Sequence, residues 1–268
     1  RTACDYGFHM TIDDWTEENI AQLPQMFEQG VVVTILLSLF TVLIGFVLAL
    51  VLALMRMSSV RPFRALGLDK DGHLRDGGFL VTLSKFNPLS FLATAYVEIL
   101  RSTPVIVQVM IIYYGVFGII DLPRFTVFGF IKFERFFPGV VALGMNSGAY
   151  LCEIIRSGLQ SVDGGQTEAA RSLGLTQKQN LRFIILPQAV KNILPAIANE
   201  FVVIIKESAI TYTIGVQDIM SAVQQVKGAT FVIIEPLLVA TAIYFCLCFP
   251  TSKVIAYFER RMSRGDKR

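Results

Sequence analysis

Charged residues are scarce in this chain of 268 residues. Asp, Glu, Lys and Arg together make up 17% of the sequence, whereas hydrophobic residues make up 53%. An average soluble domain is about one quarter charged, so this composition is too apolar for a soluble domain of the same length. The composition therefore indicates an integral membrane protein. The basic residues form no patch interleaved with aromatic residues, and nothing predicts nucleic-acid binding.

Residues that commonly build catalytic or metal sites are also few. The sequence contains two histidines and four cysteines, and three of the cysteines lie in apolar segments. The cysteine spacing fits neither a zinc site nor a disulfide framework. No Gly-x4-Gly-Lys-Ser/Thr phosphate loop occurs. We therefore expect no catalytic residue, no metal site and no cofactor in this chain.

Five apolar segments are candidates for membrane spans, since a bilayer core needs about 20 helical residues. They cover residues 30–55, 89–120, 138–159, 193–214 and 232–257. The second segment is too long for one straight helix, so we expect a break before Pro104, with Thr103 as the N-cap of the span that follows. Pro195 is expected to unwind the fourth span. The predicted fold is an all-α integral membrane protein with five transmembrane helices.

Basic residues are distributed unevenly between the segments that connect these spans. With the N-terminus outside, the inner segments hold 17 of the 24 Lys and Arg residues, and the outer segments hold five. Basic residues concentrate on the cytosolic side, so this bias predicts an N-out, C-in topology. The chain then divides into an extracytoplasmic segment 1–29, a transmembrane domain 30–258 and a cytosolic basic tail 259–268. The loop 160–192, between spans three and four, is cytosolic.

This cytosolic loop has the pattern of two short helices. Thr167 is expected to cap the start of the first helix, and Gly174 to end it, because glycine adopts positive φ readily. Thr176 and Gln179 form a capping box for the second helix, which Pro187 is expected to limit.

Three leucines of the loop, Leu173, Leu175 and Leu181, are expected to be exposed unless another surface covers them. The pattern alone leaves two interpretations open. The two helices either dock on another protein or form an amphipathic hairpin that rests on the bilayer.

The same loop resembles the EAA motif of ATP-binding-cassette (ABC) importer permeases. Glu168-Ala169-Ala170 is followed after three residues by Gly174, and after nine more by Ile184-x-Leu186-Pro187. The resemblance extends over residues 29–259, and further segments are similar to the polar amino acid subfamily: Gly30-x3-Thr34, Tyr96-Val97-Glu98, Arg101-Ser102-Thr103-Pro104, Gly148-Ala149-Tyr150 and Gly165-Gln166. Three departures are Ser102, where the subfamily usually has Gly, the run Lys206-Glu207-Ser208-Ala209-Ile210, and the loop 56–88, which is longer than usual in the subfamily.

The resemblance implies a permease subunit that forms the pathway for a polar amino acid and is not itself an enzyme. In this family the motif forms coupling helices that fit a groove of the ATPase. The residues implied in coupling here are Glu168, Ala169, Ala170, Arg171, Leu173, Gly174, Leu175, Leu186 and Pro187. The implied partners are two ATPase subunits that bind ATP and Mg, a second permease chain, identical or similar, and an extracytoplasmic amino-acid-binding protein. The implied location is the bacterial inner (plasma) membrane.

Charged residues at the depth of the membrane are candidates for the substrate pathway. Spans three and four offer partners for the carboxylate and ammonium of an amino acid, namely Tyr150, Glu153, Glu200, Lys206, Glu207 and Ser208. Local neutralisation is the other interpretation, because Glu98 and Arg101, like Glu153 and Arg156, are three residues apart on one helix face.

An alternative function is an autonomous secondary carrier or channel for a small solute. Such a protein predicts internal inverted repeats, which five spans cannot supply symmetrically. A membrane scaffold that transports nothing would have no use for the coupling motif.

Overall fold

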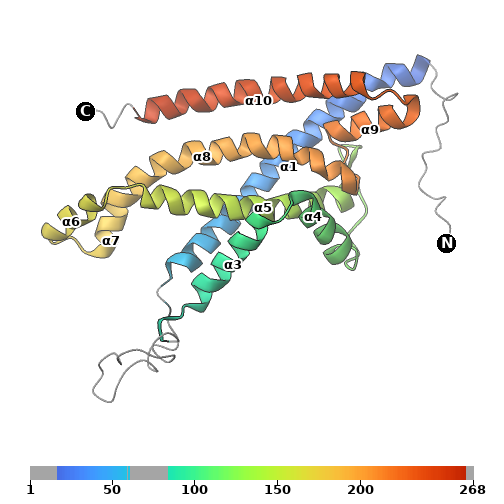
Figure 1. The fold of residues 1–268 in the computed structure, drawn as a ribbon. Coiled ribbons are helices and arrows are strands. Elements are labelled where there is room, and N and C mark those ends of the chain that lie inside the picture. Colours follow the sequence, from blue (N-terminus) through green and yellow to red (C-terminus); the bar gives the residue numbers. More distant parts are fainter. Residues whose placement is uncertain (1–16, 59, 61–83, 264–268) are drawn as a thin grey trace. The chain divides into compact units, whose positions relative to one another are not determined.

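The computed structural model describes residues 17–58, 60 and 84–263, and the chain there is almost entirely helical (Figure 1). The predicted segment 1–29, the loop 56–88 and the basic tail lie partly outside these residues. The helices are α1 (Glu17–Met57), α3 (Pro88–Ser102), α4 (Val105–Met110), π-helical η3 (Ile111–Val116), α5 (Phe133–Gln160), α6 (Gly164–Ser172), α7 (Gln177–Asn180), π-helical η4 (Leu181–Ile185), α8 (Leu186–Glu207), 3₁₀-helical η5 (Ser208–Ile214), α9 (Ile219–Thr230) and α10 (Ile234–Ser263). One antiparallel hairpin, β1 (Thr126–Val127) with β2 (Ile131–Lys132), is the exception to an all-α fold in this part of the chain.

The chain folds into two compact units, each assembled from segments that are distant in the sequence. The first unit consists of residues 1–41, 106–143 and 198–268, and the second of residues 42–105 and 144–197. Helices α1, α5 and α8 each contribute to both units.

Two helices in the described part are long and apolar enough to cross a membrane, at Leu23–Met57 and Ile234–Met262. The pair formed by Pro88–Ser102 and Val105–Val116 is a third candidate if both helices belong to one span. The predicted break in this pair is confirmed, because no helix joins Ser102 to Val105.

Thr103 has a different role at this break from the one that the sequence predicts. It is the C-cap of α3, in extended conformation, and its hydroxyl donates a hydrogen bond to the carbonyl of Ile99 at 2.9 Å. The next helix begins at Val105, after Pro104. Proline disfavours a helical conformation of the residue before it, so α3 ends at Ser102 and Thr103 is extended.

Other predicted boundaries were also wrong. Helix α5 begins at Phe133 and contains Pro138 in its interior, where the sequence predicts the end of a connecting segment. Helix α8 runs through Pro195 without a break, and the tighter winding comes after it, in η5. A proline removes only one helical hydrogen bond, so a helix packed on its neighbours can retain it. The predicted loop 215–231 contains α9, which Asp218 caps.

Close contacts between helices define the core of the second unit. Its buried residues come from α1, α3, α5 and α8, and include Ala49, Leu52, Ala93, Val97, Ala149, Leu151, Cys152, Ile155, Ala189 and Ile193. A Cβ at Gly158 would lie 2.3 Å from Cγ1 of Ile193, and one at Gly148 would lie 2.9 Å from the Leu48 side chain. Glycine therefore lets α5 approach α8 and α1 closely.

The core of the first unit is organised around α9. Ile219 and Val223 of α9 and Ala240 of α10 are buried, and apolar side chains from the start of α1 and from α10 pack against them, among them Phe27, Val31 and Leu247. Residues that the sequence assigns to a loop thus contribute to a core.

Candidate functional site: the EAA-motif hairpin

Residues 163–187, here called the motif hairpin, connect α5 to α8 through α6 and α7 (Figure 1). Helix α6 begins after Asp163, whose carboxylate accepts a hydrogen bond from the N–H of Gly165 at 2.6 Å. Thr167 lies inside α6, so the prediction that it caps this helix was wrong. Asp163 precedes Gly164-Gly165 and is itself a strong N-cap residue, which is the signal that sequence reasoning missed.

Gly174 ends α6, as predicted, with a φ of 79°. Its N–H donates to the carbonyl of Arg171 at 2.9 Å, and the N–H of Leu175 donates to the carbonyl of Ala170 at 3.0 Å. These two bonds form a Schellman motif, which closes a helix with one left-handed residue. A Cβ at Gly174 would meet no atom within 4 Å, so the backbone conformation alone favours glycine.

The predicted capping box of Thr176 and Gln179 is confirmed. The N–H of Thr176 donates to Oε1 of Gln179 at 2.9 Å, and the N–H of Gln179 donates to Oγ1 of Thr176 at 3.4 Å. The second helix does not end at Pro187, as the sequence predicts, because η4 leads directly into α8. Pro187 is the second residue of α8 and lies inside this continuous helical run.

The two halves of the motif hairpin are packed and hydrogen-bonded to each other. Helix α6 contacts both α7 and η4. Asn180 is 5% exposed, and its Nδ2 donates to Oγ1 of Thr167 at 3.3 Å. Ala170 of the motif is 1% exposed, so a larger side chain has no room there. These contacts hold the motif hairpin in one defined conformation.

Apolar side chains of the motif hairpin face outward. Leu173 is 80% exposed and Phe183 is 62% exposed, while Leu175 is partly buried. The remaining residues implied in coupling, except Ala170, are exposed: Glu168, Ala169, Arg171, Gly174, Leu186 and Pro187. Leu173 and Phe183 thus present apolar surface that the described part of the chain leaves exposed.

Glu153 of α5 lies at the centre of an ion-pair cluster. Its carboxylate accepts hydrogen bonds from Arg56 of α1 at 2.8 Å and from Nε and Nη2 of Arg156, the Nε bond being 2.8 Å long. Arg156 also donates to Oε1 of Gln160 at 2.6 Å. The predicted pair with Arg156 is confirmed, whereas Arg56, which is 97 residues away in the sequence, was missed. These contacts favour neutralisation of the Glu153 charge within the protein.

Arg101 does not pair with Glu98 in the described part of the chain. Its guanidinium lies over the ring of Tyr150, 5.4 Å from the centroid, while Glu98 is exposed. Tyr150 is thus a cation–π partner within the protein.

The other four predicted pathway residues lie in α8 and η5. Glu200 is 8% exposed, Lys206 is exposed and Glu207 is partly buried. Ser208 is fully buried, and its hydroxyl donates to the carbonyl of Ile205 at 2.8 Å. These four belong to the first unit, whereas Tyr150 and Glu153 belong to the second. A shared role in a substrate pathway stays a prediction.

Comparison with known proteins shows which protein family this chain belongs to. Residues 77–264 match the family of binding-protein-dependent transport system inner membrane components, and the chain belongs to this family. It is 35% identical over 247 residues to the arginine transport system permease protein ArtQ of Bacillus subtilis, covering 92% of this chain and 96% of that one. It is also 35% identical over 230 residues to the nopaline transport system permease protein NocM of Agrobacterium fabrum, covering 84% and 83% of the two chains.

Solved structures share the fold. The crystal structure of an amino acid ABC transporter with histidines matches with a TM-score of 0.73 and 36% identity, over 92% of this chain and 98% of that one. The MetNI methionine ABC transporter, in an inward-facing conformation, has the same fold with a TM-score of 0.63 at 16% identity. The chain is therefore a membrane protein with the fold of an ABC transporter permease.

Proposed function

We propose that this chain is the permease subunit of an ABC importer that carries a polar amino acid across a bacterial inner membrane. The names of its relatives, which include arginine, glutamine and nopaline permeases, support this substrate class. The absence of a phosphate loop supports a separate ATPase that binds ATP and Mg. The chain itself is then a transport subunit and not an enzyme.

The proposed topology has five spans with the N-terminus outside and the C-terminus inside. The spans are α1, the interrupted segment from α3 to η3, α5, α8 with η5, and α10. The excess of Lys and Arg in the inner segments supports this orientation. Arg260 and Arg261, in the last turn of α10, lie on the cytosolic side in this arrangement.

The motif hairpin is proposed to dock on the ATPase, and the exposure of Leu173 is the observation that carries this proposal. A Schellman motif, a capping box and the Asn180 to Thr167 hydrogen bond hold the hairpin in one shape. A hairpin with one fixed conformation transmits a displacement of the ATPase better than a flexible hairpin does. Two ATPase subunits that close on ATP would then move the hairpins of two permease chains and change the access of the pathway. An extracytoplasmic amino-acid-binding protein would deliver the substrate.

Glu200, Lys206, Glu207 and Ser208 remain the proposed pathway residues. Glu153 is a weaker candidate, because two arginines already bind its carboxylate.

Replacement of Leu173 tests the docking proposal. Burying a leucine at an interface contributes about 1.5–3 kcal/mol, and burying an unpaired carboxylate in its place costs more. Leu173→Glu should therefore reduce ATPase association at least about tenfold. Leu173→Met keeps an apolar side chain of similar size and is the matched control. The measurement is co-purification of the ATPase with detergent-solubilised permease.

Equal ATPase recovery with both variants would contradict docking. A hairpin that rests on the bilayer predicts that result, because lipid contact requires no ATPase.

A further inference from the structure

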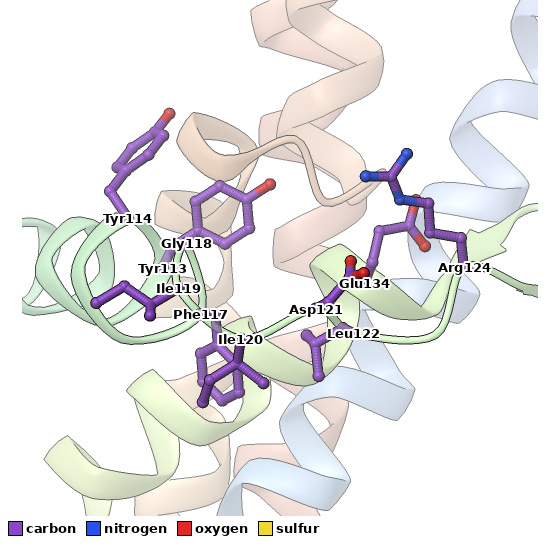
Figure 2. Close-up of a pocket in the computed structure, with 10 residues that line it drawn as sticks. All are labelled: Tyr113, Tyr114, Phe117, Gly118, Ile119, Ile120, Asp121, Leu122, Arg124 and Glu134. Atoms are coloured by element: carbon purple, nitrogen blue, oxygen red, sulfur yellow. The ribbon is translucent and has the colours of Figure 1, made fainter.

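A pocket of about 520 Å³ lies between the end of η3 and the start of α5 (Figure 2). Its lining residues fall within 113–134 and belong to the first unit. The volume is within the range of about 300–1,000 Å³ that is typical of small-molecule sites. The pocket includes part of the predicted outer segment 121–137 and none of the motif hairpin. The proposed docking function therefore does not account for it.

Aromatic packing fixes the frame of this pocket. The rings of Phe117 and Phe137 meet edge to face, with centroids 5.7 Å apart. Phe133 stacks on both Phe125 and Phe137, at 4.6 Å and 5.4 Å. Such ring pairs hold neighbouring segments in place whether or not a ligand is present.

One side of the pocket presents tyrosine rings. Tyr113 and Tyr114 meet edge to face at 4.9 Å, and Tyr114 is 63% exposed. Gly118 passes so close to Tyr114 that a Cβ would lie 2.2 Å from the Tyr114 carbonyl oxygen, so this wall requires glycine. The face of an accessible tyrosine ring attracts cations.

The other side carries charge. Figure 2 shows Arg124 and Glu134 opposite the two tyrosines, with Asp121 between them. Oε2 of Glu134 is buried and accepts no hydrogen bond from any residue that the structure describes. A buried carboxylate oxygen without a donor is costly, and a ligand ammonium or guanidinium would satisfy it once the Glu134 side chain turns this oxygen into the pocket.

We propose that this pocket binds an amino acid with a cationic side chain. Arg124 is the partner for the ligand carboxylate, and Asp121 and Glu134 are the partners for its two cationic groups. Two carboxylates and one guanidinium give the pocket a net charge that complements the net positive charge of such a ligand. A neutral amino acid leaves one carboxylate without a partner, and this difference provides selectivity. The inference rests on the proposed amino acid transport and adds a selective site at the predicted outer face.

Equilibrium binding of radiolabelled L-arginine to the full chain in lipid nanodiscs tests this site. Loss of one charge-assisted hydrogen bond in Glu134→Gln should weaken binding about tenfold to hundredfold. The matched control is Glu235→Gln, because Glu235 is an exposed carboxylate at the start of α10, outside the pocket. Tyr114→Leu is a second variant at an exposed position and should also weaken binding. Unlabelled L-glutamine should compete at least about tenfold less well than L-lysine.

No saturable arginine binding, equal competition by glutamine, or equal affinity of Glu134→Gln and Glu235→Gln would each overturn the site. If Glu134→Gln impairs only the association of the extracytoplasmic binding protein, the pocket receives a protein side chain and the small-molecule proposal is wrong. ATPase co-purification reports separately on the docking proposal, so each of the two proposals can fail while the other stands.

Discussion

At the scale of single residues, Asp218 illustrates what burial does to a carboxyl group outside the predicted spans. It is 1% exposed, and its Oδ1 accepts a hydrogen bond from the N–H of Ser221 at 2.9 Å. Its Oδ2 is buried and has no partner among the described residues. Burial raises the pKa of Asp218 from 3.8 to about 7. The folded protein therefore holds this carboxyl group protonated at pH values where an unfolded chain would ionise it.

This pKa predicts a pH dependence of stability. Between about pH 4 and pH 7 the folded state binds a proton that the unfolded state has lost, so the contribution of Asp218 to the free energy of unfolding falls as the pH rises. Asp218→Asn keeps an N-cap residue and removes this titration. The thermal stability of the wild type should therefore fall more than that of the variant between pH 4.5 and pH 7. Parallel melting curves over this range would contradict the assigned pKa.

At the scale of elements, the features that depend on a few neighbouring residues were predicted correctly. Positions at which two sequence signals compete were predicted wrongly. Gly174 and the Thr176–Gln179 box were predicted correctly because each depends on residues only a few positions apart. The sequence predicts Thr167 as a cap, whereas Asp163, four residues earlier, is the N-cap of α6. Pro187 and Pro195 do not end a helix, because proline propensity is weaker than the packing of a helix on its neighbours.

Contacts between distant segments could not be predicted from one sequence. The ion pair of Arg56 with Glu153 joins α1 to α5 across 97 positions. The pocket depends on the turn after η3, and the side chains that line it follow no motif or periodicity. The candidate site was therefore predictable where it is a local motif and not where it is a tertiary arrangement.

A pair of glycine substitutions tests the hairpin as an element. Gly174→Ala places a side chain at a φ of 79°, which should destabilise the turn by about 1 kcal/mol. Gly164→Ala is the matched control, because a Cβ there meets no atom within 4 Å and the position is helical. Hydrogen exchange of the α6 amides should accelerate in Gly174→Ala and stay the same or slow in Gly164→Ala. Equal exchange in the two variants would show that the Schellman turn does not stabilise the hairpin.

At the scale of the whole molecule, composition and one motif indicated the class correctly, while the number of spans stays a prediction. Helices α5 and α8 do not qualify as apolar spans by length and composition, whereas α1 and α10 contain segments that do. Helix α8 carries Glu200 and Lys206, charged residues of the kind that a polar pathway would use.

The central claim is that this chain carries an amino acid only when a separate ATPase drives it. The most direct measurement is uptake of radiolabelled amino acid into proteoliposomes that contain this chain with its ATPase and binding protein. The account predicts uptake that requires ATP and the ATPase, that is lost with Leu173→Glu and that persists with Leu173→Met. Uptake at the same rate by this chain alone, without ATPase or ATP, would contradict it and would identify an autonomous carrier.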